Sequence, residues 1–105
     1  MHLQEINDHD AEQNFIFVNP KAVIFFGSKT CGHCVHMLEP CRQLSDQYPE
    51  VKFAHVEITK VDPKPINLDV FPIFAIYYNQ VPIDKVVGAD EDALQAAVDK
   101  LSNLK

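Results

Sequence analysis

An apolar run that leads into a pair of cysteines constrains the fold of this chain more than any other feature. Residues 21–26, Lys-Ala-Val-Ile-Phe-Phe, are rich in β-branched and aromatic side chains and end at Gly27-Ser28. A run of this kind is typical of a central strand that is buried on both faces, as in parallel sheets. Cys31-Gly32-His33-Cys34 follows after Lys29-Thr30. The sequence therefore predicts two cysteines just beyond the end of a buried strand.

Apolar residues that recur at steps of three and four predict a helix from about Gly32 to Tyr48. The members of this stripe are Cys34, Met37, Leu38, Cys41, Leu44 and Tyr48. Pro40 lies inside the predicted helix, where it lacks a backbone donor and should kink the helix. The cysteine pair thus opens a helix, with Cys31 at its N-terminus.

The rest of the chain alternates between strand and helix patterns. We expect a strand at Val51–Ile58, strands at Pro72–Tyr78 and Val81–Val87 joined by a turn at Asn79-Gln80, and a last helix capped by Asp90. Residues 62–69 have room for little more than one helical turn, and residues 3–17 should add an edge strand and a short helix. This order predicts an α/β fold, with a parallel half joined to an antiparallel hairpin and helices over the sheet.

Length and charge narrow the class of protein. The 105 residues, 47% hydrophobic and 23% charged, are typical of one globular domain over residues 1–105. The net charge of −6 gives no electrostatic help to a nucleic-acid or anionic-membrane partner. No apolar run approaches the roughly 20 residues that cross a bilayer, and residues 1–8 lack the pattern of a secretory signal. We therefore expect a cytoplasmic monomer with neither nucleic acid nor membrane as a partner.

The spacing of the two cysteines serves zinc sites and iron–sulfur clusters as well as redox pairs. At a helix N-terminus, free N–H groups and the helix dipole stabilise a thiolate at Cys31. Cys34, one turn further in, would then resolve the mixed disulfide that Cys31 forms with a substrate. A metal site is disfavoured because His36 falls about 200° round the helix from Cys34, and Cys41 lies two turns away. We therefore favour a redox pair and expect no metal.

With these residues in place, the chain resembles the thioredoxin superfamily, and Cys31-Gly32-His33-Cys34 resembles the active-site tetrad of the protein disulfide isomerase domains. Val70-Phe71-Pro72 matches the segment with the family's cis-proline, and Gly88 matches the glycine before the last helix. The resemblance implies a thioredoxin fold, whose central mixed sheet of four to five strands is flanked by helices. It also implies thiol–disulfide exchange with protein disulfides or dithiols, no cofactor, and a reductase or glutathione as electron donor.

The resemblance assigns a role to each matched residue. Cys31 is the nucleophile, Cys34 is the resolving thiol, and Gly32 completes the tetrad. His33 stabilises the Cys31 thiolate, which favours a reduction potential nearer to about −180 mV than to about −270 mV. Pro72 is expected in cis, with the backbone of Phe71 free to pair with an extended substrate. The residues expected to contact substrate are Thr30, Phe71, Pro72 and Gly88.

Two departures from the family pattern stand near the cysteines. Thr30 replaces the usual tryptophan, and Phe25 occupies the position of the buried carboxylate that helps to move the proton of the resolving thiol. Cys34 must then lose its proton by another route, through water. His55, on the strand expected beside Phe25, is favoured as a structural or exposed residue, with proton acceptor for Cys34 as the alternative. Cys41 shares the apolar stripe and is favoured as a buried structural thiol.

The departures leave two classes of function open. The first is a thiol–disulfide oxidoreductase, acting as reductase, oxidase or isomerase according to its redox partner. The second is a thioredoxin-like binding module that docks a dedicated partner at the Pro72 groove, with incidental redox activity. The intact Cys-x-x-C favours the enzyme, while the lost carboxylate and tryptophan favour the binding module slightly.

Overall fold

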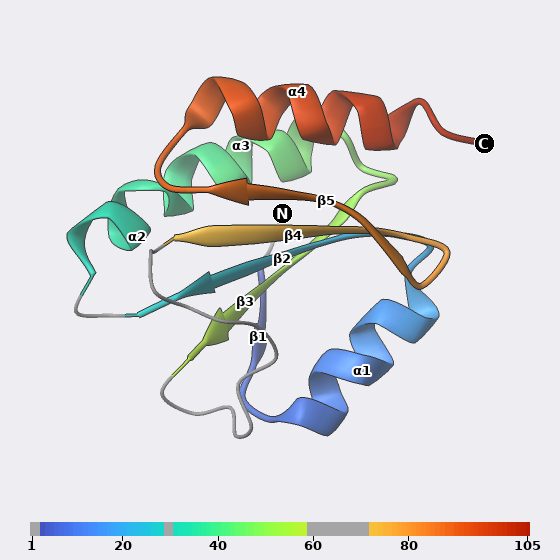
Figure 1. Cartoon of the computed structure of the whole chain (residues 1–105), viewed down its shortest axis with the longest axis horizontal. Helices are drawn as coiled ribbons and strands as arrows, with labels where there is room; N and C mark the ends of the chain where they lie inside the picture. The colour runs from blue at the N-terminus through green and yellow to red at the C-terminus, as the bar shows by residue number, and fades with distance from the viewer. Residues whose placement is uncertain (1–2, 29–30, 59–71) are drawn as a thin grey trace.

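The computed structural model describes residues 3–28, 31–58 and 72–105 (Figure 1). Along the chain the elements are β1 (Gln4–Ile6), α1 (His9–Val18), β2 (Lys21–Gly27), α2 (Gly32–His36), α3 (Leu38–Gln47), β3 (Lys52–Glu57), β4 (Ile73–Tyr78), β5 (Val81–Val87) and α4 (Glu91–Ser102). The helical turn expected at residues 62–69 lies outside the described residues. In the described parts of the chain, no helix is long and apolar enough to cross a membrane.

The strands form one five-stranded mixed sheet in the order β1-β3-β2-β4-β5. β1 and β2 both run parallel to β3, whereas β4 is antiparallel to β2 and β5 is antiparallel to β4. The predicted parallel half and antiparallel hairpin are therefore confirmed. β2 lies in the middle of the sheet, with Phe25 opposite His55 on one side and Phe74 on the other.

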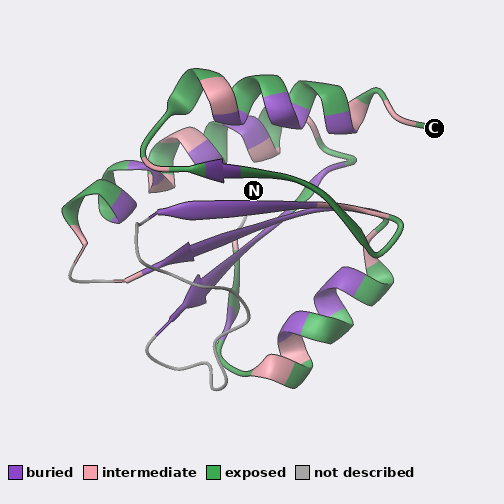
Figure 2. Cartoon of the chain, viewed as in Figure 1, coloured by how far each residue is buried: buried purple, intermediate pink, exposed green. Residues whose placement is uncertain are grey.

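Helices cover both faces of the sheet, so β2 is buried on both sides (Figures 1 and 2). Successive side chains of a strand point to opposite faces. Val23 and Phe25 pack in a cluster with residues of α3 and α4, while Ile24 and Phe26 pack in a second cluster with residues of α1. All residues from 22 to 27 are buried, which confirms the two-sided burial expected from the apolar run.

The helix expected at 32–48 is two helices, and the break lies at Met37 rather than at Pro40. Met37 is both the last cap of α2 and the first cap of α3. A proline ring clashes with the carbonyl four residues earlier, here that of His36, but is tolerated in the first turn of a helix. The chain therefore restarts the helix at Leu38, which places Pro40 in the first turn of α3.

Local signals fix the hairpin and the last helix as expected. Asn79 and Gln80 have φ angles of 50° and 74°, so both residues of the β4–β5 turn are left-handed, as a two-residue type I′ turn requires. The Asp90 carboxylate accepts a 3.0 Å hydrogen bond from the N–H of Ala93 and caps α4. The apolar face of α4 is buried at Leu94, Ala97, Val98 and Leu101.

Candidate active site

Cys31 and Cys34 lie where the chain passes from β2 into α2, and their side chains are joined as a disulfide. Their Cα atoms are 5.2 Å apart, within the ordinary range for such a bond. Cys31 is the N-cap residue of α2, and its Sγ accepts a 3.1 Å hydrogen bond from the N–H of Cys34. A sulfur in this position meets the free N–H groups of the first helical turn, which stabilise negative charge on it.

The two cysteines differ in their exposure to solvent. Cys34 is 2% exposed and belongs to the core cluster beneath α3 and α4, whereas Cys31 is partly exposed at its edge. Gly32 and His33 are exposed on the first turn of α2. A substrate can therefore reach Cys31 from solvent, whereas it cannot reach Cys34.

Gly27 is a site residue that the sequence pattern did not indicate. A Cβ atom at this position would lie 3.0 Å from Cε1 of Phe25, 3.1 Å from Cβ of Cys34 and 3.2 Å from its Sγ. These distances are too short for most real carbon contacts, so the absence of a side chain lets Cys34 lie against the end of β2. The only signal in the sequence was a glycine closing the apolar run.

The position expected for a buried carboxylate is occupied by an aromatic ring. Phe25 is fully buried, with its ring centroid 4.7 Å from that of Phe74 and 5.1 Å from that of His55. Because Cys34 and Phe25 both crowd the same point above Gly27, the resolving cysteine faces hydrocarbon on the side of β2. The central strand supplies no ionisable side chain to it.

His55 lies on β3, the strand beside β2, and is 9% exposed. Its Nδ1 is 3.1 Å from both carboxylate oxygens of Glu5, which projects from the neighbouring edge strand β1. A cavity of about 60 Å³ lies beside this histidine and Cys34, and its lining residues are Ser28, Cys34, Val35, Leu38 and His55. His55 could be singled out from the sequence, whereas Glu5 could not.

Pro72 and Gly88, two of the expected groove residues, lie together. The N–H of Gly88 donates a 2.7 Å hydrogen bond to the carbonyl of Pro72. Gly88 has a φ of +91°, a conformation that a residue with a side chain rarely adopts, and this explains glycine there. Thr30 and Phe71, the other two expected groove residues, lie outside the described residues, as does the peptide bond between Phe71 and Pro72.

Cys41 is buried completely in the core cluster that also contains Cys34. It is a free thiol, and burial raises its pKa to about 12. This confirms the expected buried thiol. Among residues 3–28, 31–58 and 72–105, no three histidine, cysteine or acidic side chains come together as a group that could hold a metal ion.

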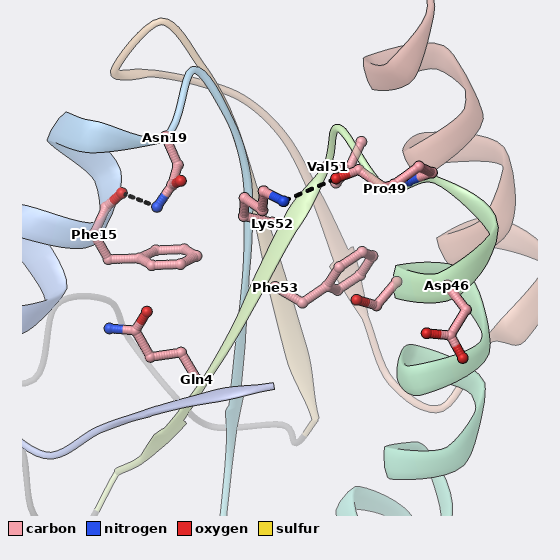
Figure 3. Close-up of a pocket in the computed structure, with 9 residues that line it drawn as sticks. Gln4, Phe15, Asn19, Asp46, Pro49, Val51, Lys52 and Phe53 are labelled. Atoms are coloured by element: carbon pink, nitrogen blue, oxygen red, sulfur yellow. Dashed lines mark hydrogen bonds between the residues drawn. The ribbon is translucent and has the colours of Figure 1, made fainter. Parts of the chain in front are cut away.

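A larger open pocket of about 470 Å³ lies at the other end of the sheet (Figure 3). It opens between α1 and α3 over the start of β3, and its lining includes Phe15, Lys52 and Phe53. The cysteines follow the carboxyl end of β2, whereas this pocket lies at the amino end of the parallel strand β3. It is therefore separate from the cysteine pair.

Comparison with known proteins agrees with this geometry. The thioredoxin family model matches residues 4–100. Thioredoxin-like 3-3 of Arabidopsis thaliana is 30% identical over 73 residues, which cover 70% of this chain and 58% of that protein. Thioredoxin-3 of Dictyostelium discoideum is 28% identical, with 75% of this chain and 78% of that protein covered. The chain thus spans little more than half of the first relative and most of the second.

Solved structures show the same fold. The thioredoxin of Malassezia sympodialis superposes with a TM-score of 0.87 at 28% identity and covers 96% of this chain and 91% of its own. The oxidised thioredoxin of Plasmodium falciparum superposes with a TM-score of 0.88 at 21% identity, with 96% and 99% covered. The fold and the Cys31–Cys34 disulfide define a thiol–disulfide oxidoreductase. The chain belongs to the thioredoxin family, and its five-stranded mixed sheet with flanking helices is the thioredoxin fold.

Proposed function

We propose that the chain exchanges dithiol and disulfide with protein substrates through an isomerase-type Cys31-Gly32-His33-Cys34 site. The observation that carries this proposal is the asymmetry of the pair: an accessible Cys31 whose sulfur accepts a helix N–H, and a buried Cys34 within disulfide distance. Reductase or glutathione would return the pair to the dithiol form.

In this mechanism the Cys31 thiolate attacks a disulfide of the substrate protein. One substrate sulfur leaves as a thiolate, and the other stays bonded to Cys31 as a mixed disulfide. Cys34 then loses its proton and attacks the sulfur of Cys31. The Cys31–Cys34 disulfide forms, the second substrate sulfur leaves, and the substrate has gained two electrons.

His33 sets the direction of exchange in this proposal. It is exposed on the first turn of α2, two residues from Cys31. A charged imidazole there stabilises the Cys31 thiolate, and hence the dithiol form, so we expect a potential nearer to about −180 mV than to about −270 mV. His33→Gln should lower the potential by about 30 mV, measured by equilibration with glutathione. A wild-type potential as low as about −270 mV would contradict this role of His33.

Pro72 and Gly88 would form one wall of the substrate groove, with Thr30 and Phe71 completing it. The bond between the Gly88 N–H and the Pro72 carbonyl ties the end of β5 to the start of β4. A rigid wall of this kind suits an extended peptide that pairs through its backbone.

Reduction of insulin disulfides in the presence of dithiothreitol tests the proposal. Turnover by the wild type should disappear in Cys31→Ser. Cys41→Ala is the matched control, since it removes the buried third thiol and should keep turnover within about twofold of the wild type. If the wild type shows no more turnover than Cys31→Ser, the proposed enzymatic function is contradicted, and a binding module with incidental redox activity is favoured instead.

A further inference from the structure

In the resolving step Cys34 must lose its proton, and the central strand β2 offers no side chain that can accept it. Cys34 must be a thiolate to attack, and burial in apolar surroundings disfavours that charge. Cys34 is 2% exposed, and the neighbouring side chain on β2 is the hydrocarbon ring of Phe25. A proton acceptor for Cys34 must therefore come from another element.

The cavity of about 60 Å³ beside Cys34 leads to His55 on β3. A space of this size has room for a water molecule, which needs two or more polar partners. The lining of the cavity is mostly apolar, and Ser28, Cys34 and His55 are the lining residues that carry a polar or ionisable group. Val35 and Leu38 supply the apolar remainder of the lining. The cavity thus borders both Cys34 and His55.

The ring of His55 is held from two sides. Phe25, opposite it in the sheet, meets it edge to face, with centroids 5.1 Å apart and ring planes at 82°. The Glu5 carboxylate lies 3.1 Å from Nδ1 through either oxygen. In the neutral imidazole this carboxylate accepts the Nδ1 proton, which leaves the lone pair on Nε2. A carboxylate behind a histidine also fixes the tautomer and the orientation of its ring.

We infer that His55 is the proton acceptor for Cys34 in the resolving step, with Glu5 as the residue that positions it. This inference rests on the proposed function, because it concerns the second half of the same exchange. The buried carboxylate expected on β2 is thereby replaced by an imidazole on β3 that is backed by a carboxylate on β1.

The resolving step moves one proton and one bonding pair of electrons. The proton of the Cys34 thiol passes through cavity water to Nε2 of His55, which becomes an imidazolium paired with the Glu5 carboxylate. The thiolate attacks Sγ of Cys31, the sulfur–sulfur bond to the substrate breaks, and the bonding pair leaves on the substrate sulfur. His55 then returns its proton to solvent or to the leaving thiolate. Cys31 and Cys34 are oxidised, and the substrate is reduced.

The ionisable groups around His55 come from three elements. β1 contributes Glu5, β3 itself contributes Glu57 two residues along the same face, and α2 contributes the Cys34 thiol. β2 contributes Phe25 and α3 contributes Leu38, which carry no charge.

An aromatic disulfide whose leaving thiolate is coloured separates the two halves of the reaction. Reduced protein mixed with 5,5′-dithiobis(2-nitrobenzoate) should release one thionitrobenzoate as Cys31 attacks and a second as Cys34 resolves. We expect His55→Gln to slow the second release about a hundredfold, at the low end of the effect of a positioned base, and to leave the first within about twofold. Imidazole added to the smaller variant His55→Ala should restore part of the second rate.

The pH profile distinguishes proton transfer from a structural role. The second rate of the wild type should fall on the acid side of its pH profile, where a protonated imidazole can no longer accept the proton of Cys34. In His55→Gln it should instead rise steadily toward alkaline pH with the thiolate fraction of Cys34. Glu5→Gln should slow the same phase; its side chain is 58% exposed, so the substitution spares the core.

His36→Gln is the matched control, because His36 is an exposed histidine on α2 that pairs with Glu91 rather than with the cavity. Both of its phases should equal those of the wild type. A second phase with unchanged rate and pH profile in both His55→Gln and Glu5→Gln would overturn the inference. A wild type that shows no second release would instead overturn the proposed function itself.

Discussion

Gly27 and Cys34 lie so close together that a single methyl group between them would be 3.2 Å from the Cys34 sulfur. The same methyl group would be 3.0 Å from the ring of Phe25, which the sheet holds in place. The buried half of the reactive pair therefore depends on a glycine at the end of the central strand.

Gly27→Ala should destabilise the oxidised protein by about 1–3 kcal/mol, the ordinary cost of forcing an extra carbon into a packed site. Urea unfolding of both redox forms measures this loss. Gly32→Ala is the control: a Cβ there would meet nothing within 4 Å, so its free energy of unfolding should not fall. Equal stability of Gly27→Ala and the wild type would contradict the close approach.

Cys41 should be inert in the folded, reduced protein. Burial raises its pKa to about 12, so almost no thiolate is present near pH 8, and reagents have no path to it. Iodoacetamide at pH 8 should therefore modify Cys31 rapidly and Cys41 only after urea is added. Peptide mapping by mass spectrometry locates the label. Rapid labelling of Cys41 in the native state would show that the thiol opens to solvent.

Glu12 should make the protein less stable as the pH rises. Its side chain is 1% exposed on α1, and among the described residues its Oε1 has no hydrogen-bond partner, with Nδ1 of His9 3.7 Å away. Burial raises the pKa of Glu12. The folded state therefore holds this proton more tightly than the unfolded state, and stability falls as pH rises from the unfolded pKa to the folded one.

Glu12→Gln removes the charge and should raise the free energy of unfolding at pH 7 by about 1 kcal/mol, with little gain at pH 4. Urea denaturation at several pH values provides the test. Glu39→Gln, an exposed carboxylate near Arg42, should change stability by less than about 0.5 kcal/mol. A Glu12→Gln protein that is less stable than the wild type at pH 7 would show that the charge is favourable.

Gln80→Gly should stabilise the β4–β5 hairpin. Gln80 has a φ of 74° and so carries a side chain in the left-handed region, where glycine is at no disadvantage. With Asn79 before it, the substitution creates an Asn-Gly type I′ turn, and we expect a gain of about 0.5–1 kcal/mol. Thermal unfolding measures it, with Gln80→Val expected to lose stability. A loss in Gln80→Gly would contradict the turn geometry.

Most of the fold could be predicted because its signals are local. The run before Gly27 identified the buried central strand, and the Asp90 cap placed the last helix. The break at Met37 was missed, because a proline acts sterically on the carbonyl four residues earlier and so displaces the break from its own position. For residues 3–17 the sequence predicted an edge strand and a short helix but not their boundaries. The edge strand β1 has only three residues, Gln4–Ile6, and pairs with β3.

The site was predictable as far as it is contiguous. Cys31 and Cys34 are three residues apart, and their place between strand and helix followed from the pattern around them. The pairing of Glu5 with His55 joins residues that are fifty positions apart in the sequence, and it depends on the register of β1 on β3. A shift of this register by one residue would turn the side chain of Glu5 to the other face of the sheet. The contact of Gly27 with Cys34 likewise depends on how α2 leaves the sheet.

The central claim is that Cys31 attacks and Cys34 resolves, and trapping the mixed disulfide tests it most directly. Reduced Cys34→Ser and Cys31→Ser proteins would each be mixed with an oxidised substrate protein and analysed by non-reducing electrophoresis and mass spectrometry. Cys34→Ser should accumulate a covalent complex through Cys31, whereas Cys31→Ser should form almost none because its remaining thiol of the pair is buried. Equal trapping by the two variants, or trapping by Cys31→Ser alone, would contradict the assignment.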